Sequence, residues 1–451
     1  MASARTTRDV AGTAPGTEPP APSERPIARH LLPDTATVAP DGRLSVGGVD
    51  VLDLVGELGT PLFVYDAAHL RARCSEAVAA FGPGVAYATK AFLCKAMARV
   101  ALDAGMSLDV STAGELATAL AAGAPPDRIV LHGNNKSDEE LETAHAAGVA
   151  RLVVDSFDEI DRLARVVAAA PRADGRDQPV LVRVTPGVEA HTHEYVMTGQ
   201  EDSKFGFSLA SGAADRAAAL LDAMGGVELV GVHAHIGSQI FRLDAYEREI
   251  AALVPYVERH ELRELCVGGG LGVAYVAGEE APTIATWAAF LRGACDAAGL
   301  APAVSVTAEP GRAIVANAAL TCYRVGTVKE LPGIRTYVAV DGGMSDNPRP
   351  VLYGSGYEAF LPRATDAERP FAARVVGKHC ESGDVLVADA RLPADVAVGD
   401  VLATPVTGAY GFSMASNYNR VPRPAVVFVE DGAASVVVRR EMVEDLLRLE
   451  P

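Results

Sequence analysis

The stretch VVGKHCESGD places an imidazole, a thiol and a carboxylate at consecutive positions, His379, Cys380 and Glu381. These groups could bind a metal ion, take part in redox chemistry, or donate a proton. Three adjacent side chains do not easily surround one zinc ion, and no second cluster has ligand spacing, so no metal site is expected. No other cysteine lies near Cys380, which disfavours a redox pair. A free thiol, with a pKa of about 8.5, is mostly protonated at neutral pH, so Cys380 is predicted to be a general acid.

Lys90 ends a short run of strand-forming residues, VAYATK, that begins at Val85. An ammonium at the end of a buried strand loses hydration unless it is paired or neutralised. One interpretation is a lysine that extends its ammonium to water. The other is an amine suited to forming a Schiff base with a carbonyl group.

Two further motifs could bind an anion beside this amine. The run CVGGGLG at Cys266–Gly272 lacks the G-x-G-x-x-G spacing of a dinucleotide site, but its glycines either bring backbone N–H groups close to an anion or form a tight turn. The run AEPGR places Glu309 before a stiff turn and Arg312 after it. A Schiff-base lysine, an anion cradle and a carboxylate together meet the needs of pyridoxal phosphate, whose ring nitrogen the carboxylate keeps protonated. A class I aldolase also uses a lysine but does not require such a glutamate.

The elements that must position these groups follow a regular alternation from about residue 60. Strand-forming runs begin at Val85, Ser107, Arg128, Arg151, Val180, Leu229, Glu264 and Ala303, with alanine-rich helical stretches between them. Eight such βα units predict a closed (β/α)8 barrel, with an open doubly wound sheet as the alternative. Polar residues gather at the C-terminal ends of the runs, where a barrel carries its chemistry: Lys90, Asp109, Asn134, Asp155, His235, Gly268 to Gly270, and Glu309.

The pattern changes after about residue 320, where short β runs are separated by glycine, proline and aspartate turns. This pattern predicts a second domain of the β-sandwich or β-barrel-like kind. We expect residues 1–30 to be a disordered tail, residues 31–60 to contribute to the β-domain, residues 61–320 to form the barrel, and residues 321–451 to form the β-domain.

Composition excludes several classes of function. The chain has 451 residues and a net charge of −18, with basic residues scattered among acidic ones. Nucleic acids and anionic membranes reward clustered Lys and Arg, so neither is the expected partner. No apolar run reaches the length of a membrane helix. The six cysteines lie far apart without a CxxC pair, and the expected location is the reducing cytoplasm.

Many of these motifs, in this order, resemble those of the diaminopimelate decarboxylases, which belong to the fold-type III pyridoxal phosphate enzymes. The resemblance runs from about Leu32 to Leu447. The matching stretches are YATKAF, SLDVSTAGEL, HGNNKS, THEYVMTGQEDSKFGFS, HAHIGSQ, GGGLG, AEPGRAIVA, DGGMSDNPRPVLYG, GKHCESGD and GAYGFSMASNYN.

The resemblance implies a role for each matching position. Lys90 would form the Schiff base, and His235 would stack on the cofactor. Glu309 would contact the pyridine nitrogen, and further cofactor contacts would come from Ser238, Gly270, Gly311, Arg312 and Tyr410. The substrate would be bound by Arg312, Arg349, Tyr353, Glu381 and Tyr410. Cys380 would donate the proton. The family is homodimeric, and the Cys380 loop would reach the partner's barrel.

The implied reaction is loss of carbon dioxide from the D-configured end of meso-diaminopimelate, which gives L-lysine in the last step of lysine biosynthesis. Arg312 and Arg349 would bind the distal carboxylate and Glu381 the distal ammonium, although Arg349 is also compatible with a surface loop charge. Two alternatives stay open. One is a related decarboxylase that acts on an ornithine-, lysine- or arginine-like or carrier-bound amino acid. The other is a protein that binds pyridoxal phosphate without turnover, which retention of Cys380 and Glu381 disfavours.

Overall fold

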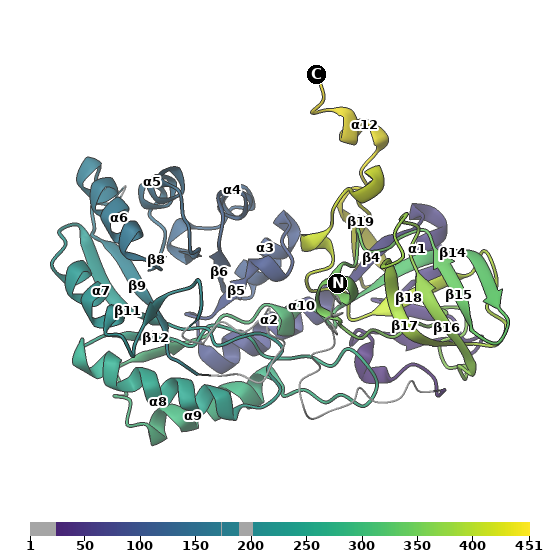
Figure 1. Cartoon of the computed structure of the whole chain (residues 1–451), viewed down its shortest axis with the longest axis horizontal. Coiled ribbons are helices and arrows are strands. Elements are labelled where there is room, and N and C mark those ends of the chain that lie inside the picture. Colours follow the sequence, from purple (N-terminus) through teal and green to yellow (C-terminus); the bar gives the residue numbers. More distant parts are fainter. Residues whose placement is uncertain (1–23, 173, 189–201) are drawn as a thin grey trace, which may run out of the picture.

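Eight parallel strands form one half of the molecule in a computed structural model that describes residues 24–172, 174–188 and 202–451 (Figure 1). Neighbouring strands follow chain order, and a short strand, β10 (Phe207–Ser208), pairs with β9. Backbone N–H groups of Ala86 and Ala88 donate to the carbonyls of Ala308 and Pro310, which joins the first strand to the last. The predicted (β/α)8 barrel is therefore confirmed. Its strands are β5 (Ala86–Ala88), β6 (Ser107–Val110), β7 (Ile129–Leu131), β8 (Arg151–Val154), β9 (Gln178–Thr185), β11 (Val227–His233), β12 (Glu264–Cys266) and β13 (Ser305–Thr307).

Helices surround these strands (Figure 1). Several begin at a Ser or Thr whose hydroxyl accepts the backbone N–H three residues later, which satisfies a donor that the helix itself leaves unpaired. These caps are Thr112, Ser137, Ser156 and Thr283. The helices are α2 (Ala67–Phe81), α3 (Lys95–Asp103), α4 (Ala113–Ala121), α5 (Asp138–Ala147), α6 (Phe157–Ala169), α7 (Ala213–Asp222), α8 (Asp244–Arg259), α9 (Ile284–Ala297) and α10 (Arg312–Val315).

A mostly β domain forms the other half, which confirms the second expected fold class (Figure 1). Its sheet runs in the order β17-β16-β15-β14-β4-β19-β20, and β18 also pairs with β14. The strands are β4 (Leu62–Asp66), β14 (Ala319–Leu331), β15 (Arg335–Val340), β16 (Phe371–Val376), β17 (Val385–Leu392), β18 (Val401–Pro405), β19 (Ala425–Glu430) and β20 (Ala433–Val438). The short helices α11 (Arg349–Tyr353) and α12 (Val443–Leu447) also belong to this half.

The segment before the barrel divides differently from our expectation. Strand β4, which the expected boundary at residues 60 and 61 assigns to the barrel, pairs with β14 and β19 of the β-domain sheet. Strands β1 (Thr37–Val38), β2 (Leu44–Val46) and β3 (Val49–Asp50) form a separate small sheet, followed by α1 (Val51–Leu58). The small sheet forms by local pairing, whereas β4 joins its sheet by pairing with strands far along the chain. We propose that the barrel begins after β4, at α2.

The expected N-terminal tail is only partly described. Residues 1–23 lie outside the described residues. Residues 24–30, which we expected to be disordered, instead pack on the β-domain. The buried Arg369 donates its backbone N–H to the carbonyl of Glu24 and its Nε to the carbonyl of Arg25. Ile27 is also buried, so apolar contact adds to these hydrogen bonds.

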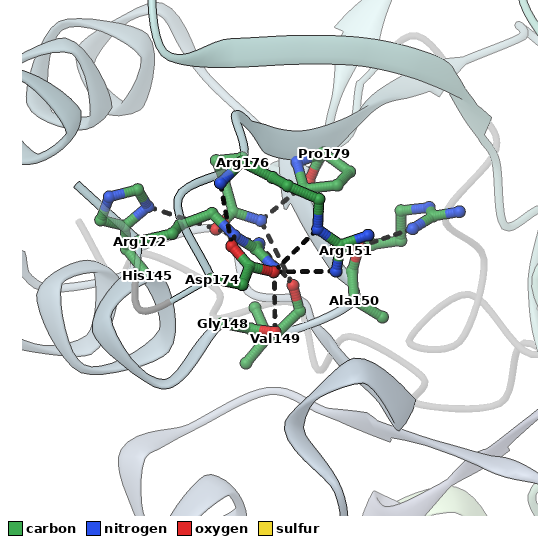
Figure 2. Close-up of polar contacts among 10 residues, drawn as sticks. His145, Gly148, Val149, Ala150, Arg151, Arg172, Asp174, Arg176 and Pro179 are labelled. Atoms are coloured by element: carbon green, nitrogen blue, oxygen red, sulfur yellow. Dashed lines mark hydrogen bonds and ion pairs between the residues drawn. The ribbon is translucent and has the colours of Figure 1, made fainter.

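The N-terminal ends of β8 and β9 carry a polar cluster centred on Arg172 (Figure 2). The buried guanidinium of Arg172 donates to the carbonyls of Gly148 and Val149 and pairs with Asp174. Beside it, His145 contacts Gln178 and the carbonyl of Ala170. This end of a barrel supports stability rather than chemistry.

Within the described ranges, no helix combines the length and apolarity that a membrane crossing requires.

Candidate active site

A cavity of about 590 Å³ opens at the C-terminal ends of the barrel strands. The structure brings together there all the predicted site residues except Cys380 and Glu381. Those that line it are Lys90, His235, Ser238, Gly270, Glu309, Gly311, Arg312, Arg349, Tyr353 and Tyr410. Residues from the barrel and from the β-domain thus share one cavity.

Lys90 stands two residues beyond the end of β5, in a single turn of 3-10 helix, Thr89–Ala91. The strand is buried as expected, but the Lys90 side chain itself is exposed and faces the open cavity. The adjacent backbone is anchored from the β-domain: the N–H of Tyr410 donates to the carbonyl of Ala91 at 2.8 Å, and the Ser413 hydroxyl donates to the same carbonyl. Tyr410 has φ +60°, an uncommon conformation for a bulky residue, so this contact is held against local strain.

Glu309 lies two residues beyond β13, and each of its carboxylate oxygens contacts a different imidazole. The Nε2 atom of His132 lies 2.8 Å from Oε1, and the Nε2 atom of His233 lies 3.0 Å from Oε2. All three side chains are buried. The sequence motifs did not single out His132 or predict a role for His233. The available signal was their place at strand ends, and for His233 its spacing of two from His235, which puts both on one face of the strand.

The glycine-rich loops form a close-packed backbone cradle. Gly270 has φ +103°, and a Cβ atom at this position would clash with the carbonyl of Gly237. A Cβ atom at Gly269 would likewise clash with the carbonyl of Glu309. The N–H of Gly269 donates to Nδ1 of His235 at 3.2 Å, which leaves the proton of a neutral ring on Nε2. Burial, and then the nearby charge of Lys90, lower the pKa of His235 well below its ordinary value, so this ring is neutral.

Two buried guanidinium groups, Arg312 of α10 and Arg349 of the β-domain, line the cavity. Arg312 donates to the hydroxyls of Tyr275 and Ser238 at 2.6 and 2.8 Å, and its guanidinium carbon lies 4.8 Å from the centre of the Tyr410 ring. Its Nε atom is buried and has no hydrogen-bond partner among the described residues.

Arg349 is held in a similar way at the start of α11. It donates to the hydroxyls of Tyr357 and Ser355, both at 3.0 Å, and lies over the rings of Tyr275 and Tyr353. Neutral hydroxyls and ring faces position both guanidinium groups without neutralising them. The cavity is therefore equipped to bind an anionic group.

The Cys380 loop lies elsewhere in the chain. Cys380 is exposed, and its backbone N–H donates to Oδ1 of Asn419. The neighbouring His379 is buried, where its Nε2 atom contacts the Ser345 hydroxyl at 2.8 Å. Glu381 accepts a hydrogen bond from the exposed Tyr418. The loop is thus well anchored, yet neither Cys380 nor Glu381 lines the cavity.

The cavity fits pyridoxal phosphate on the chemistry of its groups. It offers the exposed amine of Lys90 for a carbonyl group and the carboxylate of Glu309 for a ring nitrogen. For a phosphate it offers a glycine cradle beside the unpaired N–H of Arg312. His235 adds a neutral ring on which an aromatic group can stack.

Comparisons with known sequences agree with this fit. Residues 67–316 match the family described as "Pyridoxal-dependent decarboxylase, pyridoxal binding domain". The chain is 46% identical over 444 residues to the diaminopimelate decarboxylase of Mycobacterium tuberculosis, with 94% of this chain and 98% of that protein covered. It is also 46% identical over 428 residues to the diaminopimelate decarboxylase of Bacillus subtilis, covering 91% and 95% of the two chains.

Solved structures show the same similarity. The diaminopimelate decarboxylase of M. jannaschii in complex with L-lysine superposes with a TM-score of 0.85 at 30% identity, covering 93% of this chain and 98% of that one. The Helicobacter pylori diaminopimelate decarboxylase complexed with L-lysine gives a TM-score of 0.79 at 31% identity, covering 88% and 98%. A lysine/ornithine decarboxylase from Vibrio vulnificus shares the fold at 23% identity, with a TM-score of 0.71 and 84% and 97% covered.

Proposed function

Because the chain belongs to the pyridoxal-dependent decarboxylase family, we propose that it is a diaminopimelate decarboxylase that removes carbon dioxide from meso-2,6-diaminopimelate and releases L-lysine. The observation that carries this proposal is one cavity that holds Lys90, Glu309, Arg312 and Arg349 together. An amine and a carboxylate serve the cofactor, and the guanidinium groups serve the anionic groups of cofactor and substrate.

We assign the cofactor contacts to residues that line this cavity. Lys90 would condense with the carbonyl group of pyridoxal 5'-phosphate, with release of water, and His235 would pack on its ring. Glu309 would accept a hydrogen bond from the pyridine N–H and so keep that nitrogen protonated. Further contacts around the phosphate end would come from Ser238, Gly270, Gly311, Arg312 and Tyr410. When bound, the cofactor supplies a protonated ring that stabilises the carbanion formed when carbon dioxide leaves.

The substrate contacts follow from charge. Arg312, Arg349 and Tyr353 would bind the distal carboxylate, and Glu381 would bind the distal ammonium through a charge-assisted hydrogen bond. Cys380 would give its thiol proton to the carbon atom that has lost carbon dioxide, and the thiolate would then regain a proton from water. A substrate without a distal carboxylate would leave Arg349 without its anion and would remove one of the two anionic partners of Arg312.

We further propose a homodimer in which Cys380 and Glu381 complete the partner's cavity. Their exposure, and their absence from the cavity lining of their own chain, support this arrangement. A well-anchored loop with a chemically suited thiol at its tip would otherwise have no substrate to act on. Six free thiols, five of them buried, fit the reducing cytoplasm as the proposed location.

The direct test is incubation of the purified protein and its cofactor with meso-diaminopimelate. L-lysine and carbon dioxide should appear in equal amounts. L-lysine and L-ornithine, which lack the distal carboxylate, should be turned over at least about a hundredfold less efficiently, since a lost charged hydrogen bond costs roughly 2–3 kcal/mol. Comparable turnover of either amino acid would favour a decarboxylase of different specificity. Cofactor binding without carbon dioxide release would favour the non-catalytic alternative.

A further inference from the structure

Glu309 belongs to a chain of four buried polar residues that runs across the barrel mouth. His132 follows β7, His233 ends β11, and Asp109 lies in β6. The Nε2 atom of His132 lies 2.8 Å from Glu309 and 3.6 Å from Oδ1 of Asp109. The rings of His132 and His233 meet edge to face, with centroids 4.8 Å apart. Four barrel strands, β6, β7, β11 and β13, thus bring two carboxylates and two imidazoles together.

The contacts of Glu309 suit an ionised carboxylate. Each oxygen lies within hydrogen-bond distance of a different imidazole Nε2 atom, and an ionised carboxylate can accept from both rings. Burial alone would raise the pKa of Glu309. The electrostatic effect of His132, then that of His233, and the hydrogen bonds with both rings hold that pKa well below its ordinary value.

The two histidines differ in charge. Burial lowers the pKa of both rings. For His233 this effect dominates and brings the pKa to about 4, so the ring is neutral at pH 7. For His132 the charges of Asp109 and Glu309 outweigh burial and raise the pKa above its ordinary value. Only His132 therefore has two carboxylates to hold it as a cation.

We propose that His132 is a positioning residue that keeps Glu309 ionised and fixed toward the cofactor's ring nitrogen, with Asp109 holding the imidazole in its charged form. His233 fixes the second oxygen of Glu309 as a neutral donor. This inference rests on the proposed function, because Glu309 needs its charge only if it faces a protonated ring nitrogen.

Other charged groups near these four buried residues do not replace His132. Arg183 of β9 also approaches it, but is paired with Asp155 at 3.7 Å. Burial raises the pKa of Asp109 to about 6. The charges of Lys90 and Glu115 have smaller, opposite effects on the same pKa. Without His132, the buried Glu309 would keep only neutral donors and the more distant charge of Arg183. Its pKa would then rise, and the proton it gained as the pH fell would block the contact with the ring nitrogen.

The test measures cofactor affinity against pH in the full-length protein. His132→Gln and His233→Gln both retain an amide N–H near the position of Nε2 but cannot carry a charge. The quantity compared is each variant's dissociation constant for pyridoxal phosphate divided by that of the wild type. This ratio cancels the ionisation of the cofactor phosphate and of Lys90.

For His132→Gln the ratio should rise at least about tenfold between pH 8 and pH 6, because each pH unit below a pKa removes tenfold of the ionised form. For His233→Gln it should stay within about threefold across this range. Asp109→Asn leaves both rings in place and should shift the ratio in the same direction as His132→Gln, by less. It also serves as the second variant if His132→Gln does not fold. His145→Gln, a buried histidine at the other end of the barrel, is the matched control and should not change the ratio.

The experiment distinguishes failure of the role of His132 from failure of the proposed function. The role of His132 would be overturned, while the proposed function stands, in either of two cases. In the first, the ratio changes equally with pH in His132→Gln and His233→Gln. In the second, it does not change with pH in His132→Gln and Asp109→Asn. A wild-type protein that binds no pyridoxal phosphate would overturn the proposed function and this inference together.

Discussion

Lys90 lines the cavity at the barrel mouth, whereas Cys380 of the same chain lies on an exposed loop of the β-domain outside that cavity. Both side chains face solvent in the isolated chain. The loop is nevertheless fixed by hydrogen bonds from His379 to Ser345 and from the Cys380 backbone to Asn419. Rigid placement of a thiol away from its own cavity is the geometry that a site shared between two chains requires.

Replacement of Lys90 tests the cofactor link. The purified wild-type protein should show the visible absorption band of a Schiff base with pyridoxal phosphate, and Lys90→Ala should lose it because no other amine occupies this position. Absorption spectroscopy provides the measurement. Lys95→Ala, at an exposed lysine in α3, is the control and should keep the band. A band that persists in Lys90→Ala would rule out this residue as the attachment point.

Replacement of Arg349 tests substrate recognition. Arg349→Lys keeps the charge but loses the planar fork that Tyr357 and Ser355 hold in place. We expect kcat/KM for meso-diaminopimelate to fall by roughly a hundredfold, since a charged hydrogen bond is worth about 1.5–3 kcal/mol. The visible band should be unchanged. Arg335→Lys, at an exposed arginine of β15, should leave both quantities intact. Wild-type kinetics in Arg349→Lys would remove this residue from the substrate site.

Glu249 gives a prediction about stability and pH. It is fully buried in α8, and neither carboxylate oxygen has a hydrogen-bond partner among the described residues. Burial raises its pKa well above the ordinary value, so the folded protein holds a proton that the unfolded chain releases above about pH 4.3. Stability therefore falls as the pH rises from that point.

Glu249→Met should remove this cost. The free energy of unfolding should rise by about 1–3 kcal/mol at pH 8, and by less at pH 4, where the unfolded state also holds the proton. Denaturant unfolding at the two pH values measures the change. Glu247→Met, at an exposed position of the same helix, is the control. A gain that is the same at both pH values would show that Glu249 is not protonated in the folded state.

Much of the fold follows from local sequence patterns. All eight predicted barrel strands are present, because buried parallel strands are encoded by short apolar runs between helical stretches. The pairing of β4 with β14 and β19 joins residues more than 250 positions apart. The boundary expected at residues 60 and 61 precedes β4, because motif spacing does not determine which sheet this strand joins.

Some residues of the site are likewise predictable from the sequence, and others are not. Lys90, Glu309 and Arg312 are recognisable because a charge at the end of an apolar strand is unusual. His132 and His233 were missed because an imidazole at a strand end is as common in structural roles, and only the fold shows that both meet Glu309. The position of Cys380 outside the cavity likewise depends on how the β-domain packs on the barrel, which motif spacing does not determine.

The shared site is tested most directly by mixing two inactive variants, Lys90→Ala and Cys380→Ala, under conditions in which subunits exchange. A heterodimer contains one cavity with both substitutions and one with neither. Activity should therefore recover to about a quarter of the wild-type value after random pairing. Differently tagged subunits that purify together establish that exchange has occurred. If they do so and activity stays at the sum of the two parent variants, Lys90 and Cys380 do not act across two chains.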